Sequence, residues 1–334
     1  MVPMPTKTGT CGWARLYQAF SSSEMKGKTS LQFYAERFPA VEINSSYYKH
    51  HRISTYENWR RETSEKFDFT MKCHKYVSQR PKLVPTNEVL ESFQESVEEA
   101  GACKAKAILI QTPSSLRATE DVLEAADSFF AKIDTEGIPV AWETRGESWE
   151  DDKSRARLAQ LLQKYNVTHV TDPFKNDSVF VREMAYFRLH GLPGYNLKYT
   201  YTNGELMGLY GKIKPLEKKV KTVYVFFNNY AMYRDAERFM ILLKNRRLPP
   251  SSFGPRSVTY ALRSFENWPA TKDELMERCG GWYVWIAPSR TVKLKEILKH
   301  LKDGHYNDVD EMEEESTRIW NKTGFPNTDD IERV

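Results

Sequence analysis

Cysteine is scarce in this chain, and no apolar run is long enough to span a bilayer. Cys11, Cys73, Cys103 and Cys279 are far apart in the 334 residues and form no C-x-x-C pair. This spacing argues against a zinc cluster and is typical of proteins in a reducing compartment. The chain has no stretch of about 18 consecutive apolar residues, and residues 1–7 lack the features of a signal peptide. We therefore expect a cytoplasmic protein without membrane association.

Glycine-rich phosphate loops and dense metal-ligand clusters are missing as well. Neither G-x-G-x-x-G nor G-x-x-x-x-G-K-[ST] follows an early strand-like run, so we expect no nucleotide cofactor held by such a loop. A three-metal centre of the endonuclease IV kind needs more histidines and carboxylates than His190, Glu42, Glu143 and Asp172 supply. We predict no dedicated metal site, and one Mg²⁺ or Mn²⁺ held by carboxylates stays an open alternative.

Short β-like runs alternate with longer helical patterns as far as about residue 250. The runs predict eight strands, at residues 7–12, 40–44, 68–73, 107–111, 139–144, 168–172, 185–190 and 222–228. The segments between them predict helices at residues 29–38, 87–102, 119–135, 153–165, 204–216 and 233–243. Repetition of this unit is typical of a TIM-like (β/α)8 barrel, and an open doubly wound sheet is the second choice.

The composition changes after residue 248. Residues 248–255 are rich in proline and read as a linker, so we predict a barrel domain at 1–248 and a small, mostly helical C-terminal domain with an acidic tail at 249–334. Within this second domain we expect a helix at 272–278 capped by Thr271, a strand at 282–286 and an amphipathic helix at 292–301. The net charge of +4 hides a basic segment at 211–250. That segment is either a phosphate-attracting surface or an ordinary solvated helix face.

Polar residues stand two apart at the ends of four predicted strands. The pairs are Glu42 with Asn44, Lys72 with His74, Glu143 with Arg145, and Arg188 with His190. Because strand side chains alternate between faces, the members of each pair point the same way. The carboxyl ends of barrel strands meet at one mouth, so the pattern predicts a polar site there. The alternative is a structural ion network that fills the barrel.

The residue types in these pairs suggest roles. Glu143 and Glu42 are candidates for general acid or base, and His190 for proton transfer near neutral pH. Three cations, Lys72, Arg145 and Arg188, suit a phosphate or carboxylate. Amides at strand ends and aromatic residues in the following loops would orient or stack a ligand. The amides are Asn44, Gln111 and Asn228, and the aromatic residues are Trp13, Tyr17, Tyr47, Tyr48, Trp149, Tyr195, Tyr199 and Tyr201.

With these motifs in place, residues 8–245 resemble the domain of unknown function 72 family, the YecE-like proteins. The resemblance rests on motifs in the family's order and spacing, among them Gly9-Thr10-Cys11-Gly12-Trp13, Val41-Glu42-Ile43-Asn44, Trp142-Glu143-Thr144-Arg145 and Arg188-Leu189-His190-Gly191. It implies a TIM-like barrel and brings no settled activity. The chain departs from the family pattern at Ser78-Gln79-Arg80, where a Thr-His-Arg-like triplet is usual.

Three functions are compatible with this pattern. The first is an enzyme that binds nucleic acid or a nucleotide-like phosphate ester and hydrolyses or rearranges it, with DNA or RNA as a partner. The second is a sugar or sugar-phosphate enzyme that uses the same residues. The third is a non-catalytic binding protein whose mouth is structural. The surplus of inward cations favours a small anionic ligand or a phosphate backbone over a neutral one.

Overall fold

Eight parallel strands close into a barrel in chain order, as the sequence predicts. The structure is a computed structural model, and it describes residues 6–16, 19–20, 25–79, 82–245, 254–262, 265–287, 290–323 and 332–333. The barrel strands are β1 (Thr6–Thr10), β2 (Ala40–Ile43), β3 (Asp68–Lys72), β4 (Ile108–Gln111), β5 (Val140–Glu143), β6 (Thr168–Thr171), β7 (Met184–Leu189) and β8 (Thr222–Phe227). Strand β1 pairs with both β2 and β8, which closes the sheet.

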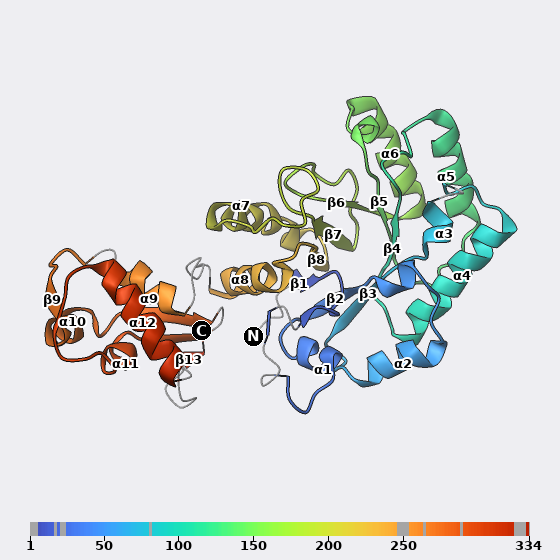
Figure 1. Cartoon of the computed structure of the whole chain (residues 1–334). Helices are drawn as coiled ribbons and strands as arrows, with labels where there is room; N and C mark the ends of the chain where they lie inside the picture. The colour runs from blue at the N-terminus through green and yellow to red at the C-terminus, as the bar shows by residue number, and fades with distance from the viewer. Residues whose placement is uncertain are drawn as a thin grey trace. The chain divides into compact units, whose positions relative to one another are not determined.

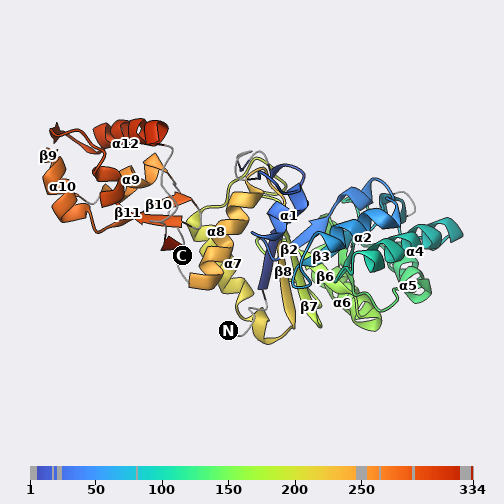
Figure 2. The same cartoon turned by 90° about the horizontal axis from the view of Figure 1, so that it is seen from below.

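Helices alternate with these strands along the chain, except that β6 is followed directly by β7 among the described residues. They are α1 (Ser30–Ala35), α2 (Ile53–Arg61), α3 (Lys75–Ser78), α4 (Asn87–Ala102), α5 (Glu120–Lys132), α6 (Asp152–Tyr165), α7 (Asn203–Ile213) and α8 (Met232–Asn245), with 3-10 turns η2 (Ser45–Tyr47), η3 (Glu147–Trp149) and η4 (Leu216–Lys218). Helices α2 and α4–α6 lie outside the strands in both views (Figures 1 and 2). The sequence did not predict α2, because its one buried residue, Tyr56, gives no apolar periodicity. Among the described residues, no helix combines the length and apolar character that a bilayer crossing requires.

Alternation along each strand divides the buried residues of the barrel into two sets. One set faces the axis and forms a small apolar cluster of Ala40, Ala107, Leu109, Ala141, Val170, Met184, Tyr186, Tyr224 and Phe226. Val41, Ile43, Met71 and Trp142 have the opposite parity and are fully buried. Both faces of a barrel sheet are covered, which explains why the strands are buried throughout. A polar residue that shares the axial parity is therefore held inside the barrel.

The chain divides into two compact units, residues 1–201 with 208–236, and residues 202–207 with 237–334. The second unit contains α9 (Pro255–Leu262), α10 (Lys272–Cys279), α11 (Lys295–Leu298) and α12 (Val309–Thr323). It also holds an antiparallel sheet of β10 (Tyr283–Ala287), β11 (Arg290–Lys293) and β13 (Glu332–Arg333), and the pair β9 (Ala270–Thr271) and β12 (His305–Tyr306). Its own core includes Val258, Leu275, Val284, Ile297, Leu298, Met312 and Ile319.

The local predictions for this second unit have mixed outcomes. Thr271 caps α10 through a capping box with Glu274, which confirms the helix expected at 272–278. The strand expected at 282–286 is β10. The helix expected at 292–301 is wrong over its first part, because residues up to Lys293 form β11 and only the short α11 follows. Most of the predicted proline-rich linker, 248–253, lies outside the described residues.

Candidate functional site

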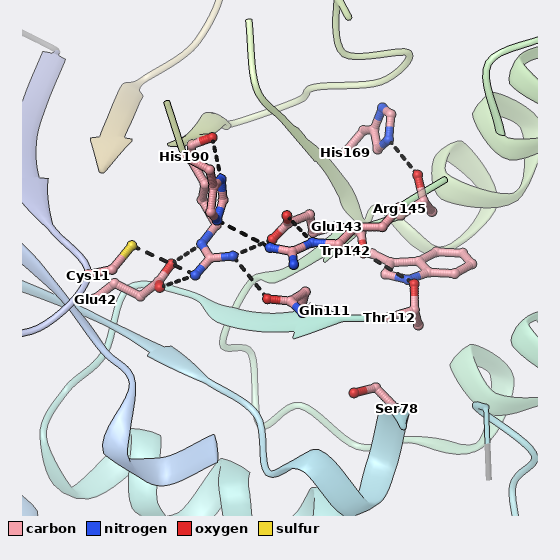
Figure 3. Close-up of polar contacts among 12 residues, drawn as sticks. Cys11, Glu42, Ser78, Gln111, Thr112, Trp142, Glu143, Arg145, His169 and His190 are labelled. Carbon is pink, nitrogen blue, oxygen red and sulfur yellow. Dashed lines mark hydrogen bonds and ion pairs between the residues drawn. The ribbon is translucent and has the colours of Figure 1, made fainter. Parts of the chain in front are cut away.

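The last axial residues of several strands carry polar side chains into the barrel. Glu42 ends the axial row of β2, Lys72 that of β3, Gln111 that of β4, Glu143 that of β5, and Arg188 that of β7. Each of these residues is buried, with exposed fractions between 0% and 9%. Figure 3 shows Glu42, Gln111, Glu143, Arg145 and His190 gathered in one place, although they come from four different strands or the loops that follow them. The structure thus brings these predicted residues together.

Arg188 is the centre of a closed ion network. Its Nε and Nη2 donate to the two carboxylate oxygens of Glu42, at 2.9 and 2.8 Å. Its Nη1 donates to Gln111 Oε1 at 3.1 Å and to Glu143 Oε2. The Tyr186 hydroxyl adds a hydrogen bond of 2.7 Å to Glu42 Oε2. Bidentate pairing of this kind compensates for the burial of the three charges.

A second arginine extends the network toward the surface. Arg145 Nε donates to Glu143 Oε1 at 2.8 Å, and its Nη2 lies 3.2 Å from His190 Nε2 (Figure 3). His190 Nδ1 lies 3.2 Å from the backbone oxygen of Arg188. A carbonyl oxygen can only accept, so Nδ1 carries the hydrogen and Nε2 presents its lone pair to Arg145. His190 is therefore a neutral imidazole in this arrangement.

The charges in the network fix the ionisation of its members. Burial opposes the charged form of Glu143, but the attraction of Arg188 and Arg145 outweighs it and holds the pKa of this carboxyl well below its ordinary value. Burial, reinforced by Arg188, lowers the pKa of His190 to about 3. Near neutral pH the site thus holds an ionised Glu143 beside an uncharged imidazole.

Lys72 stands apart from this pairing. Its exposed fraction is 7%, and its amine makes no hydrogen bond or ion pair with any residue that the structure describes. The amine lies 3.7 Å from the ring centroid of Tyr47, a residue of η2. Burial, followed by repulsion from Arg188, lowers the pKa of Lys72 to about 8. Glu42 and Glu143 attract the amine, but among the described residues it forms no ion pair with them.

A cleft of about 340 Å³ opens beside the network, over the ends of β5, β6 and β7. Arg145 and His190 line it on one side, and Asp172, Arg155, Lys175 and Tyr195 contribute further side chains. Burial raises the pKa of Asp172 to about 6. Asp172 Oδ1 accepts from the Phe174 backbone N–H at 3.0 Å, while Oδ2 is buried without a hydrogen-bond partner.

Sequence analysis missed the contribution of Arg155 and Lys175 to this cleft. Lys175 lies in the loop after β6, and Arg155 lies in α6, where it reads as an ordinary exposed helix residue. The position of Asp172, directly after β6 and with the axial parity of Val170, was the one available signal. From sequence, Asp172 is considered only as a metal ligand.

Other predicted site residues lie away from an open mouth. Trp149 is 4% exposed, and its Nε1 donates to Leu116 O at 2.7 Å. Tyr201 is 1% exposed, and its hydroxyl accepts from the Gly191 backbone N–H at 2.8 Å. These two rings are packed inside the loops, and a ligand could stack on them only if the loops opened. Tyr199 packs against Tyr201, Asn44 precedes η2, and Asn228 follows β8.

The remaining predictions differ in outcome. His74, which shares strand parity with Lys72, leaves the mouth and packs on His50, with 4.2 Å between ring centroids. Tyr17 and Arg80 lie outside the described residues. Within the described part of the chain, no group of three or more His, Cys, Asp or Glu side chains is arranged to hold a metal ion. The carboxylates of Glu42 and Glu143 bond to arginine instead.

The fold and this mouth define a TIM-type (β/α)8 barrel with a charged interior at its carboxyl end. The chain belongs to the family described as "Protein of unknown function DUF72", whose profile matches residues 7–256. One relative, "UPF0759 protein YunF" of Bacillus subtilis (strain 168), is 24% identical over 281 residues, which cover 75% of this chain and 98% of the relative.

Two crystal structures of DUF72 family proteins share the fold. The protein from Thermotoga maritima MSB8 is 22% identical, with a TM-score of 0.59 over 72% of this chain and 99% of its own. The protein from Enterococcus faecalis V583 is 21% identical, with a TM-score of 0.57 over 73% of this chain and 98% of its own.

Proposed function

We propose that the protein is an enzyme that binds a phosphate ester at the barrel mouth. The observation that carries this proposal is the unpaired amine of Lys72 beside an already neutralised ion network. Arg188, Arg145 and Lys72 face two carboxylates, Glu42 and Glu143, so the buried cluster has a positive surplus whenever Lys72 is protonated. An enclosed positive surplus favours an anionic ligand because low local polarity strengthens the attraction.

Arg145 is the cation best placed to contact the phosphate, and Lys72 adds positive charge close to it. Arg145 is half-buried and lines the cleft, whereas Arg188 is 2% exposed and uses its donors on Glu42, Glu143 and Gln111. We therefore assign Arg188 to positioning the two carboxylates. A direct contact between Arg188 and the ligand would require one of these partners to leave.

Glu143 or Glu42 remains our candidate for the general base and His190 for the general acid. Because Arg188 and Arg145 lower the pKa of Glu143, this role requires the ligand to draw Arg145 away from Glu143 Oε1. A neutral imidazole with a pKa of about 3 cannot donate as an imidazolium at neutral pH. A phosphate bound next to Arg145 would change this, because it would draw Arg145 away from His190 Nε2 and add a negative charge nearby. Both effects raise the pKa of a histidine. Proton donation by His190 is thus expected only in the ligand complex.

The first test is the affinity for inorganic phosphate and for nucleoside monophosphates, measured by titration calorimetry. Arg145→Ala and Lys72→Met should each weaken binding by about tenfold or more, which corresponds to about 1.4 kcal/mol. Lys75→Met, which changes an exposed lysine three residues along the chain, should leave the affinity unchanged. Equal affinity in all four proteins would refute the proposed site.

The second test concerns turnover of a phosphodiester such as bis(p-nitrophenyl) phosphate. Glu143→Gln should abolish turnover and spare binding, because the amide keeps the shape but cannot act as a base. Retained turnover in this variant would remove Glu143 from the mechanism. Binding of a single-stranded oligonucleotide that falls steeply with salt would favour a nucleic-acid substrate, and the alternative of a sugar phosphate predicts no such polymer binding.

A further inference from the structure

Lys72 is the least explained charged group in the barrel. Lysine is rarely buried unless it is paired, because removal of an ammonium from water is strongly unfavourable. Lys72 lies at 7% exposure near two carboxylates, yet both of these bond to Arg188 and neither bonds to the lysine. A salt bridge therefore does not account for its position. Charged groups held in such unfavourable surroundings are frequently functional, and Lys72 interacts electrostatically with Arg145, which lines the cleft.

The surroundings of Lys72 are those of an activated amine. Burial, with repulsion from Arg188 and Arg145, outweighs the attraction that Glu42, Glu143 and the face of the Tyr47 ring at 3.7 Å exert on the ammonium. Burial next to other cations is one of the ways in which proteins turn lysine into a nucleophile. With a pKa of about 8, about one amine in ten is uncharged at pH 7, compared with less than about one in a thousand for an ordinary lysine.

We propose that Lys72 forms an imine with a phosphorylated aldehyde or ketone that binds at the mouth. The phosphate half of this inference rests on the proposed function, and the covalent half rests on Lys72 itself. Arg145, Arg155 and Lys175 line the cleft and supply cations for the phosphate. Lys72 lies outside the cleft lining but close enough to Arg145 for the two charges to repel each other, and it would supply the amine for the carbonyl. The substrate class is thus a sugar that carries both a carbonyl group and a phosphate, either as a free sugar phosphate or as a sugar within a nucleic acid.

The reaction needs no oxidant, reductant or cofactor. The lone pair of the neutral Lys72 amine attacks the carbonyl carbon, a C–N bond forms, and the carbonyl oxygen takes up a proton. Loss of the resulting hydroxyl as water, with transfer of a nitrogen proton, leaves a protonated imine. That imine draws electrons away from the neighbouring carbon, which is how lysine imines promote proton removal or bond cleavage at that position.

Reductive trapping of the full-length protein tests the inference. Sodium borohydride converts an imine into a stable secondary amine, and mass spectrometry of the intact protein and its peptides locates the adduct. One arm uses glyceraldehyde 3-phosphate and ribose 5-phosphate. A second arm uses a single-stranded oligonucleotide with one abasic site, whose sugar is an aldehyde flanked by phosphates. Trapping in the first arm alone identifies a free sugar phosphate, and preferential trapping in the second identifies a nucleic acid.

Two variants separate the site from background labelling. Lys72→Arg keeps the positive charge but has no nucleophilic amine, so its adduct should fall by at least tenfold. Lys75→Arg should label like the wild type. Trapping should increase between pH 6 and 9 in the wild type as the amine loses its proton. Absence of an adduct, or an adduct of equal yield in Lys72→Arg, overturns the inference.

The same experiment distinguishes failure of the inference from failure of the proposed function. Loss of trapping together with intact phosphate binding removes the imine and leaves the phosphate site in place. Equal trapping of glyceraldehyde and glyceraldehyde 3-phosphate at Lys72 keeps the imine and removes the phosphate site. Preference for the phosphorylated compound at Lys72 supports both.

Discussion

Lys72 should destabilise the fold that contains it. Its pKa is lower in the folded protein than in the unfolded chain, so folding disfavours the protonated form and the penalty is complete below about pH 8. Lys72→Met should therefore raise the free energy of unfolding at pH 7 by about 1–3 kcal/mol. Urea denaturation followed by tryptophan fluorescence measures this change.

The pH dependence provides the control for this prediction. Between pH 8 and the ordinary pKa of 10.5, the stability of the wild type should approach that of the variant, because the folded lysine is already neutral there. Lys75→Met, at an exposed site, should change stability by less than about 0.5 kcal/mol. A Lys72→Met protein that is less stable than the wild type at pH 7 would mean that Lys72 makes a favourable contact.

At the residue scale, sequence alone predicted which side chains meet but not how they pair. Strand alternation is local, so it placed Glu42, Glu143 and Arg188 on the axis of the barrel. Their pairing depends on the shear of the closed sheet, which joins residues 146 positions apart in the bond between Arg188 and Glu42. The burial of Trp149 and Tyr201 could not be predicted from sequence either, because it depends on how the loops fold over one another.

At the scale of single elements, the close packing of β1 against β2 requires a glycine at position 9. A Cβ atom at Gly9 would lie 2.0 Å from the backbone oxygen of Ala40 in β2 and 3.0 Å from the hydroxyl of Tyr34. Gly9→Ala should therefore push β1 away from β2 and lower the free energy of unfolding by about 1–3 kcal/mol or more. Chemical denaturation at neutral pH checks this expectation.

A second glycine offers the matched control. Gly101 is an exposed residue of α4, and a Cβ atom there would meet nothing within 4 Å. Gly101→Ala should raise stability by about 0.5–1 kcal/mol because alanine favours the helix. Equal effects of the two substitutions would show that contact with Ala40 does not restrict Gly9.

The barrel elements were predictable because long apolar runs and amphipathic helices have strong periods. The predictions were weaker where elements are short. Residues 292–301 contain apolar residues at helical spacing, yet Val292 pairs with Val284 in the β10–β11 hairpin. Pairing between two segments overrode the local pattern there, as happens where strand contacts bury more surface than an isolated helical turn.

At the scale of the whole molecule, acid should destabilise the barrel in a defined range of pH. Burial lowers the pKa values of His169 and His190 to about 4 and about 3, so the unfolded chain takes up protons first as the pH falls below 6.5. Each histidine then lowers the free energy of unfolding by up to about 1.4 kcal/mol per pH unit. Asp172, whose pKa is raised to about 6, acts in the opposite direction below that pH.

From these three groups together, we expect a loss of about 1.4 kcal/mol per pH unit between pH 6 and 4, because the Asp172 contribution offsets one histidine. Urea denaturation at several pH values measures the slope. His169→Gln should reduce this slope by the contribution of one proton, about 1.4 kcal/mol per pH unit. His300→Gln, at an exposed site, should leave the slope unchanged. An unchanged slope in His169→Gln would mean that this histidine is not held neutral in the fold.

The bonds from Arg188 to Glu42 and Glu143 restrict how this barrel can diverge. Replacement of the arginine by a neutral residue would leave two buried carboxylates without this counterion, and replacement of either acid would leave its buried guanidinium with a single carboxylate. A lineage that alters one of the three positions therefore has to alter another at nearly the same time. We therefore expect the positions of Glu42, Glu143 and Arg188 to covary across related sequences.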